Sequence, residues 1–133
     1  MAFRHFVRAI SSAAVLSLGL SASLDGSVEA HRTMYLSFSA PVTLPGVALA
    51  PGTYVFELAD PQVDPSIVRV LSRDRSTVYF MAFTEMVRRP ASLRRETVVS
   101  LGEAAPGRPV PITAWYPDGD SNGRRFIYRE GQR

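Results

Sequence analysis

The sequence predicts an all-β fold: a single-domain antiparallel β-sandwich of roughly seven to eight short strands, with a small β-barrel as the alternative. Three observations predict it. Apolar and polar residues alternate with a period of two in most segments, which is the period of a strand with one buried face. These segments recur about every ten residues, and turns rich in proline and glycine separate them. No segment carries an apolar stripe with the 3.6-residue period of an amphipathic helix.

The clearest strand signal surrounds a proline-glycine turn near the middle of the chain. Two alternating runs, Val42–Leu44 and Val47–Leu49, lead into the turn at Pro51-Gly52. Proline presets φ for the first central position of a type II turn, and glycine accepts the positive φ of the second. The run Thr53–Leu58 follows, with its two aromatic residues on one face. These segments predict a tight reversal that feeds a core strand.

Further strand segments lie on both sides of this turn. Val78–Phe83 is apolar on both faces, and we therefore expect it to be a central strand. We expect loops at the charge-rich stretch Glu85–Glu96 and the proline-rich stretch Gly102–Pro111. The remaining predicted strands are Met34–Phe38, Ile67–Leu71, Thr97–Leu101, Ile112–Tyr116 and Phe126–Tyr128. The predicted core comprises Met34, Leu36, Phe38, Val55 or its neighbours Tyr54 and Phe56, Val70, Phe80, Val99, Trp115 and Ile127.

Residues 1–30 are typical of a cleavable signal peptide, which leaves residues 31–133 as the mature β domain. A basic start precedes an apolar stretch of small residues, and Val28-Glu29-Ala30 offers the small residues that a signal peptidase requires. We expect cleavage after Ala30, with the Ala22-Ser23 region as the competing site. The alternative is an uncleaved anchor, but the apolar stretch is shorter than the roughly 20 residues needed to span a bilayer. No transmembrane segment is expected in the mature chain. The expected location is the bacterial periplasm or the exterior of the cell.

Two segments carry a resemblance to known proteins. The segment LPGVALAPGTYVFEL is similar to the L-P-x-G-x-Y-x-F strand signature of a family of small exported bacterial β proteins. The later segment ITAWYPDGDSNGRRFIYRE is similar to the closing aromatic, proline and glycine pattern of the same family. More loosely, the first segment resembles prealbumin-like and carboxypeptidase-regulatory-like sandwich domains. The resemblance implies a β fold and export, and because its motif residues are scaffold residues, it implies no catalytic residue.

The composition excludes several catalytic mechanisms. The chain has no cysteine, which rules out disulfides, thiol catalysis and a lipid anchor on cysteine. All 15 lysine-or-arginine residues are arginine, so no lysine can act as a nucleophile or form a Schiff base. His31 is the one histidine of the mature chain, which excludes the usual Ser-His-Asp arrangement. We therefore predict a non-catalytic binding or structural domain rather than an enzyme.

A small hydrolase is the third hypothesis, and it would depend on paired carboxylates. The pairs are Asp60 with Asp64 and Asp118 with Asp120. Each pair lies within one turn-like segment, where Asp bends the chain and bonds to nearby backbone. We interpret both pairs as loop residues.

The stretch Asp118-Gly119-Asp120-Ser121-Asn122-Gly123 fits the first half of a calcium-loop pattern. In that pattern, oxygens of Asp118, Asp120 and Asn122 would bind one Ca²⁺ ion, and the glycine permits the tight bend. The second half does not fit, because Arg129 stands where a bidentate Glu is needed. A hairpin loop is the simpler interpretation, and a calcium-stabilised β module is the alternative function. Apart from calcium, no cofactor is predicted.

Arginines occur in pairs in the charge-rich stretch Glu85–Glu96 and again near the end of the chain, and they suggest a site for an anionic ligand. The net charge is only +3, and acidic residues are interspersed, so a solvated surface is the competing interpretation. The predicted partners are an envelope protein or an anionic glycan or lipid, and not nucleic acid, because no nucleic-acid-binding module is recognisable. The predicted patch comprises Arg88, Arg89, Arg94, Arg95, Arg124 and Arg125, with Arg108 as a further member.

Overall fold

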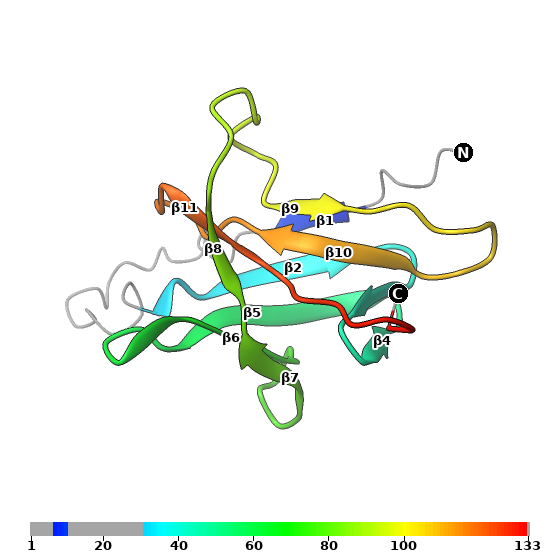
Figure 1. The fold of residues 1–133 in the computed structure, drawn as a ribbon. Coiled ribbons are helices and arrows are strands. Elements are labelled where there is room, and N and C mark those ends of the chain that lie inside the picture. The colour runs from blue at the N-terminus through cyan, green and yellow to red at the C-terminus, as the bar shows by residue number, and fades with distance from the viewer. Residues whose placement is uncertain (1–6, 11–30, 133) are drawn as a thin grey trace.

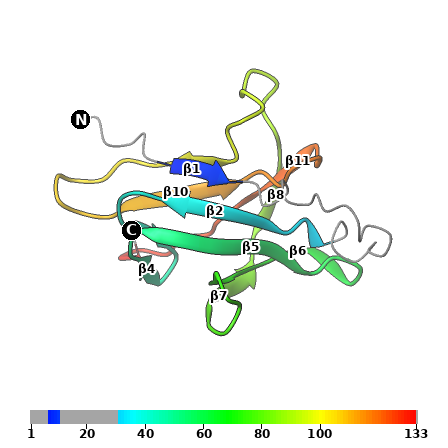
Figure 2. The same cartoon turned by 180° about the vertical axis from the view of Figure 1, so that it is seen from behind.

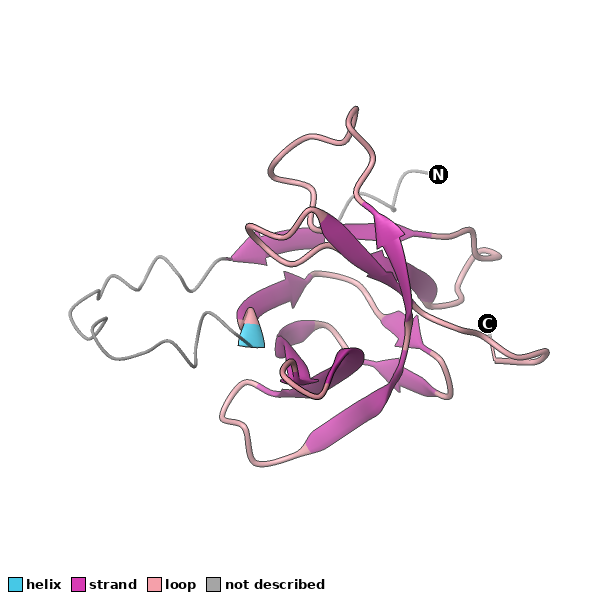
Figure 3. Ribbon diagram, turned by 60° about the vertical axis from the view of Figure 1, so that its left-hand side comes forward, coloured by secondary structure: helices cyan, strands magenta, loops and turns pink. Residues whose placement is uncertain are grey.

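The computed structural model describes residues 7–10 and 31–132, and every secondary-structure element in these ranges is a strand. The strands form two sheets that face each other across an apolar interior (Figures 1 and 3). The prediction of an all-β sandwich is therefore confirmed. The rest of the expected signal peptide, with its cleavage position at Ala30, lies outside the described residues.

The first sheet has five strands in the order β1-β2-β5-β6-β7, and all neighbouring strands are antiparallel. β1 belongs to the expected signal peptide and pairs with the outer edge of β2 (Figure 2). A chain cleaved after Ala30 would lose this strand and leave that edge of β2 unpaired. The strands are β1 (Val7–Ile10), β2 (Met34–Phe38), β5 (Gly52–Asp60), β6 (Asp64–Ser72) and β7 (Val78–Phe83).

The second sheet has six strands, five of them in the order β4-β3-β10-β11-β8, with β9 also paired to β10. The pair β3 and β10 is parallel, and the other pairs are antiparallel. The Tyr128 hydroxyl supports this parallel pair, because it lies within hydrogen-bond distance of the carbonyls of Thr43 and Ile112, at 2.9 and 2.7 Å. The strands are β3 (Val42–Leu44), β4 (Val47–Leu49), β8 (Glu85–Arg88), β9 (Val99–Leu101), β10 (Val110–Trp115) and β11 (Asn122–Arg125).

Aromatic side chains from the two sheets meet in the core. The rings of Phe56 and Trp115 lie with centroids 5.8 Å apart, and Phe80 packs edge-on against Phe126 at 5.5 Å. Most of the predicted core residues are buried there. The prediction of Ile127 is wrong, because this side chain is 48% exposed whereas Phe126 is 4% exposed. The alternation in this segment is displaced by one residue, which exchanges the buried and exposed faces.

The outer face of β5 is also buried. Val55 and Glu57 are 0% and 2% exposed, although they alternate with the core residue Phe56 and so lie on the opposite face. Arg69 of β6 lies opposite Glu57 in the strand register and donates to its carboxylate from Nε at 2.8 Å and Nη2 at 2.5 Å. Thr33 adds a hydroxyl hydrogen bond to the same carboxylate at 3.3 Å. A buried charge on this face is thus paired rather than isolated, as burial of a charge requires.

The prediction that Val78–Phe83 is a central strand is wrong, because β7 is the last strand of the first sheet. The chain then continues through Thr84 into β8, the last strand of the second sheet (Figure 1). Thr84 is buried at this corner, where its N–H and its hydroxyl donate to the Ser66 carbonyl at 2.9 and 2.6 Å. One nearly continuous strand from Val78 to Arg88 therefore forms an edge of both sheets.

Several boundaries differ from the sequence prediction. β8 lies within the expected loop Glu85–Glu96, β11 begins within the expected loop Asp118–Gly123, and Phe126–Tyr128 is not a strand. β8 and β11 pair with each other, and the Glu85 and Arg125 side chains form an ion pair across them. Because charged residues of low strand propensity form these strands, tertiary pairing rather than local sequence determines them.

Candidate functional site

An open cleft of about 690 Å³ lies where the loop after β8 meets the loop between β10 and β11. It brings together residues from both predicted sites, since Arg89 and Arg95 come from the arginine set and Asp118 and Asp120 from the calcium-loop pattern. Both loops continue directly from strands of the second sheet, so the sheet determines where they start. The lining residues are Arg89, Arg95, Glu96, Val98, Tyr116, Pro117, Asp118, Gly119 and Asp120.

Arg89 organises the first of these loops. Its Nη2 donates hydrogen bonds to the carbonyls of Arg94, Arg95 and Thr97 at 2.6, 3.4 and 3.1 Å. Its guanidinium also lies over the ring of Tyr116, 5.3 Å from the centroid, in a cation–π arrangement. These contacts fix the guanidinium of Arg89 against the wall of the cleft.

Tyr116 is positioned by a glycine beneath it. A Cβ atom at Gly123 would lie 2.4 Å from Cδ1 and 2.5 Å from Cε1 of the Tyr116 ring. Only glycine leaves room for this contact, because real Cβ atoms essentially never approach closer than 3.0 Å. The Tyr116 hydroxyl accepts a hydrogen bond from Ser100 at 3.2 Å, which fixes the other end of the ring.

Ion pairs neutralise only some of the charges around the cleft. Glu96 pairs with Arg94 at 3.6 Å, and Asp120 pairs with Arg124 at 3.0 Å. Among the residues that the structure describes, Arg89 and Arg95 have no carboxylate within ion-pair distance, and the Asp118 carboxylate has no cation within that distance. Arg32 donates instead to the backbone carbonyl of Asp118 at 3.4 Å. The cleft therefore carries two arginines without a carboxylate partner against one unpaired carboxylate.

The oxygens of the calcium-loop pattern are partly engaged in other contacts. Asp120 accepts from the backbone N–H of Asn122 through Oδ1 and from Arg124 through Oδ2, both at 3.0 Å. Asn122 itself is the first residue of β11. Within residues 7–10 and 31–132, no group of three or more His, Asp or Glu side chains is arranged to hold a metal ion. The calcium site at Asp118, Asp120 and Asn122 remains a prediction.

The predicted arginines do not gather into one surface patch. Arg124 is 1% exposed, and its guanidinium donates to the carbonyls of Pro65 and Asn122 at 2.7 and 3.0 Å, so it links the two sheets from inside. Arg125 is on the surface but pairs with Glu85. Arg88 is exposed on β8.

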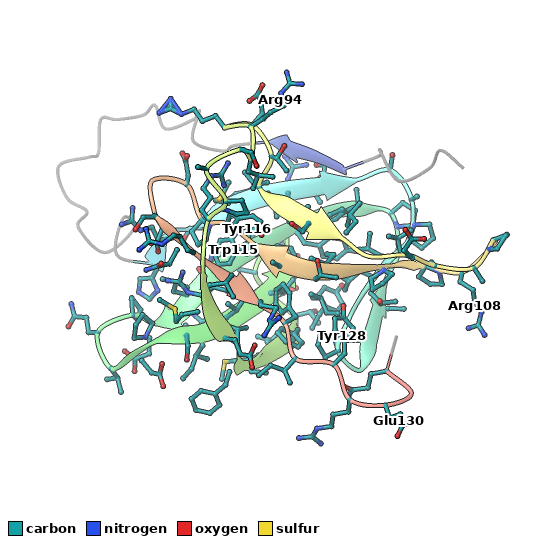
Figure 4. All side chains as sticks on the ribbon, turned by 45° about the horizontal axis from the view of Figure 1, so that its top comes forward. Arg94, Arg108, Trp115, Tyr116, Tyr128 and Glu130 are labelled. Carbon is teal, nitrogen blue, oxygen red and sulfur yellow. The ribbon has the colours of Figure 1, made fainter. Side chains whose placement is uncertain are left out.

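Two further arginines of the set lie on separate loops. Figure 4 shows Arg94 and Arg108 projecting from different loops of the molecule. Arg108 lines a second cleft of about 570 Å³ with Thr43, Glu103 and other residues. The predicted arginines therefore lie at separate places on the molecule. Of this set, Arg89 and Arg95 alone line the first cleft.

One of the two carboxylate pairs of the hydrolase hypothesis, Asp60 with Asp64, belongs to the β5–β6 hairpin. Asp60 and Asp64 are cross-strand partners at its end. Oδ1 of Asp64 accepts from the hydroxyl and the N–H of Ser66 at 2.6 and 3.0 Å, which lowers the pKa of this carboxyl. A carboxyl with a lowered pKa is poorly suited to act as the general acid of a glycosidase.

Sequence reasoning missed the roles of Tyr116 and Gly123 in this site. No sequence signal distinguishes a ring that lies on a glycine from an ordinary core tyrosine. The role of Arg89 was also missed, since the sequence does not show which arginine of the Arg88-Arg89 pair turns inward. The available signal was the aromatic-rich stretch before a glycine-containing loop, which indicates close backbone approach but not its partner.

Comparison with known proteins adds no functional assignment. No protein-family model, curated protein or solved structure matches the chain. The resemblance to exported bacterial β proteins therefore stays a prediction. In the part of the chain that the structure describes, no helix is long and apolar enough to cross a membrane.

Proposed function

We propose that this chain is an exported, non-catalytic binding domain whose first cleft takes an anionic glycan, a sugar chain that carries carboxylate groups. The observation that carries the proposal is the charge of the cleft. Arg89 and Arg95 line it without carboxylate partners among the described residues, and Asp118 is its one unpaired carboxylate. A ligand with both an acidic group and hydroxyl groups matches this arrangement.

The fixed guanidinium of Arg89 supports binding of the acidic group. Its three carbonyl bonds use Nη2 alone and leave its positive charge uncompensated. The Nε–H and Nη1–H groups make none of these bonds, and each can donate a charge-assisted hydrogen bond to a carboxylate. Because Arg89 is already held in place, binding costs little additional side-chain entropy.

Asp118 supports a sugar rather than a bare anion. An ionised carboxylate only accepts hydrogen bonds, and sugar hydroxyls donate them. An anion without a hydrogen-bond donor, such as sulfate, cannot satisfy the Asp118 carboxylate in this way. The cleft therefore favours a ligand in which hydroxyl groups lie beside an acidic group.

The proposal is tested by titration calorimetry of the purified protein with oligogalacturonate and with its methyl ester. The two ligands share the same sugar rings, but the ester carries no charge. We expect the acid to bind, with an affinity that falls as salt is added, and the ester not to bind. Arg95→Gln should weaken binding by about tenfold, the effect of losing one charge-assisted hydrogen bond.

Arg108→Gln is the matched control, because it makes the same change at an exposed arginine of the second cleft. It should leave the affinity unchanged. Equal affinity for the acid and the ester, or an equal loss in the two variants, would overturn the proposal.

A further inference from the structure

β7 is the last strand of the first sheet, and one side of its backbone has no partner strand among the described residues. The hydrogen bond from Thr84 N–H to the Ser66 carbonyl shows which residues face β6. In an antiparallel ladder such hydrogen-bonded pairs alternate with non-hydrogen-bonded ones. Ala82 therefore bonds to β6, whereas the N–H and C=O groups of Met81 and Phe83 point away from it.

The side chains along this edge are apolar and exposed. Met81 and Phe83 are 58% and 61% exposed, and both lie on the outer face of the sheet. The strand contains no charged residue and no proline, which are the usual protections of an edge against pairing. An uncharged edge with unpaired backbone groups is a template for another strand.

We propose that β7 pairs antiparallel with β7 of a second copy of the chain, around a two-fold axis at Ala82. This register places Met81 of each copy opposite Phe83 of the other. Because both residues direct their backbone groups outward, each of the two pairs exchanges N–H···O=C hydrogen bonds. The thioether of Met81 then lies beside an aromatic ring, a favourable contact that the symmetry forms twice.

The sequence of β7 favours a second copy over a foreign strand. Met81 and Phe83 are two residues apart on one face, so an antiparallel copy brings unlike apolar side chains together without opposing any charges. Ala82 has the smallest side chain of the three, and it occupies the non-hydrogen-bonded position where the two backbones come closest, at about 4.5 Å between Cα atoms. The edge ends where the chain turns at Thr84 and the charges of β8 begin.

The first test measures the mass of the purified protein in solution by sedimentation equilibrium. We expect a dimer, and monomers for the single variants Met81→Lys and Phe83→Glu, which place an unpaired charge at the pairing edge. The double variant Met81→Lys plus Phe83→Glu should dimerise again, because in this register the introduced lysine faces the introduced glutamate. Val63→Lys is the control, since Val63 is 79% exposed but lies in the β5–β6 turn.

A second test uses the absence of cysteine from the chain. Ala82→Cys should form a symmetric disulfide between two copies on oxidation, because the Cα separation at this position suits a disulfide. Met86→Cys, on β8, should not form one. A wild-type protein that stays monomeric at all concentrations, or a double variant that stays monomeric while folded, would overturn the proposal.

Discussion

The carboxylate of Glu57 holds Arg75, a residue of the β6–β7 turn, with both of its oxygens 3.0 Å from Nη2. The backbone of Arg75 has a φ of 66°, in the left-handed region that non-glycine residues seldom adopt. The same carboxylate binds Arg69 of β6. Glu57 thus joins the turn to the outer face of the sheet through two arginines, and this contact offsets the unfavourable backbone conformation of the turn.

We predict that Glu57→Gln lowers the free energy of unfolding by about 2 kcal/mol, because a neutral amide replaces a buried carboxylate that accepts from two cations. Glu96→Gln is the matched control. Glu96 also pairs with an arginine, but the pair with Arg94 is 70% to 80% exposed and should contribute less than about 0.5 kcal/mol. Urea unfolding of both variants measures the difference, and equal losses would contradict the assigned role of Glu57.

A second prediction concerns Gly123 and the ring of Tyr116. Gly123→Ala should destabilise the protein by about 2 kcal/mol, because the added methyl group displaces the ring and overpacks the site. The same change made together with Tyr116→Ala should cost little more than Tyr116→Ala alone. A double-mutant cycle of unfolding free energies measures this coupling, and additive losses would show that the ring is not the cause.

Stability in acid should depend on Asp74. Hydrogen bonds from the hydroxyl and the N–H of Ser76, and from the hydroxyl of Ser72, lower the pKa of Asp74 from 3.8 to about 2. Because the folded-state pKa is depressed, the ionised carboxylate stabilises the protein fully above about pH 4 and progressively less as the pH falls towards 2.

Asp74→Asn should therefore make the unfolding free energy fall less steeply between pH 4 and pH 2. Ser76→Ala should act in the same direction, since it removes one of the hydrogen bonds. Chemical unfolding at a series of pH values measures the slope. A slope unchanged in both variants would contradict the assignment.

Calcium provides a fourth prediction. Binding at the Asp118–Asn122 loop would have to displace Arg124 from Asp120, so we expect calcium at roughly 1–10 mM to raise the melting temperature no more than magnesium does. Differential scanning calorimetry with both ions makes the comparison. A rise specific to calcium that Asp120→Asn abolishes would establish the site instead.

The sequence correctly predicted the strands in which apolar and polar residues alternate, because such strands bury one face and expose the other. Met34, Leu36 and Phe38 alternate with more exposed residues, and all three are in the core. The pattern gave a wrong prediction for the position of Val78–Phe83 in the sheet, because both faces of this strand are apolar. Such a strand is expected between two neighbours, but in β7 the outward side chains are exposed at an edge.

The cleft was predictable only in part. The sequence identified two loops with charged residues, and the fold brings Arg95 and Asp118 of these loops to one cleft. It could not show that Arg124 would turn inward while Arg125 stays on the surface, because neighbouring residues on a strand point to opposite faces. The face to which each of these two side chains points depends on the register of β11 with β8 and β10. That register is set by contacts between segments far apart in the sequence.

The strand that runs from β7 through Thr84 into β8 connects the proposed dimer edge to the loop that forms the cleft. In a dimer built on β7, each copy contributes one cleft at the far end of this strand, so the distance between the two clefts is constant. A long acidic polymer that spans this distance meets both clefts at once, and its second contact forms at a high effective concentration. The proposed dimer would thus give a repetitive ligand an avidity that a single cleft cannot provide.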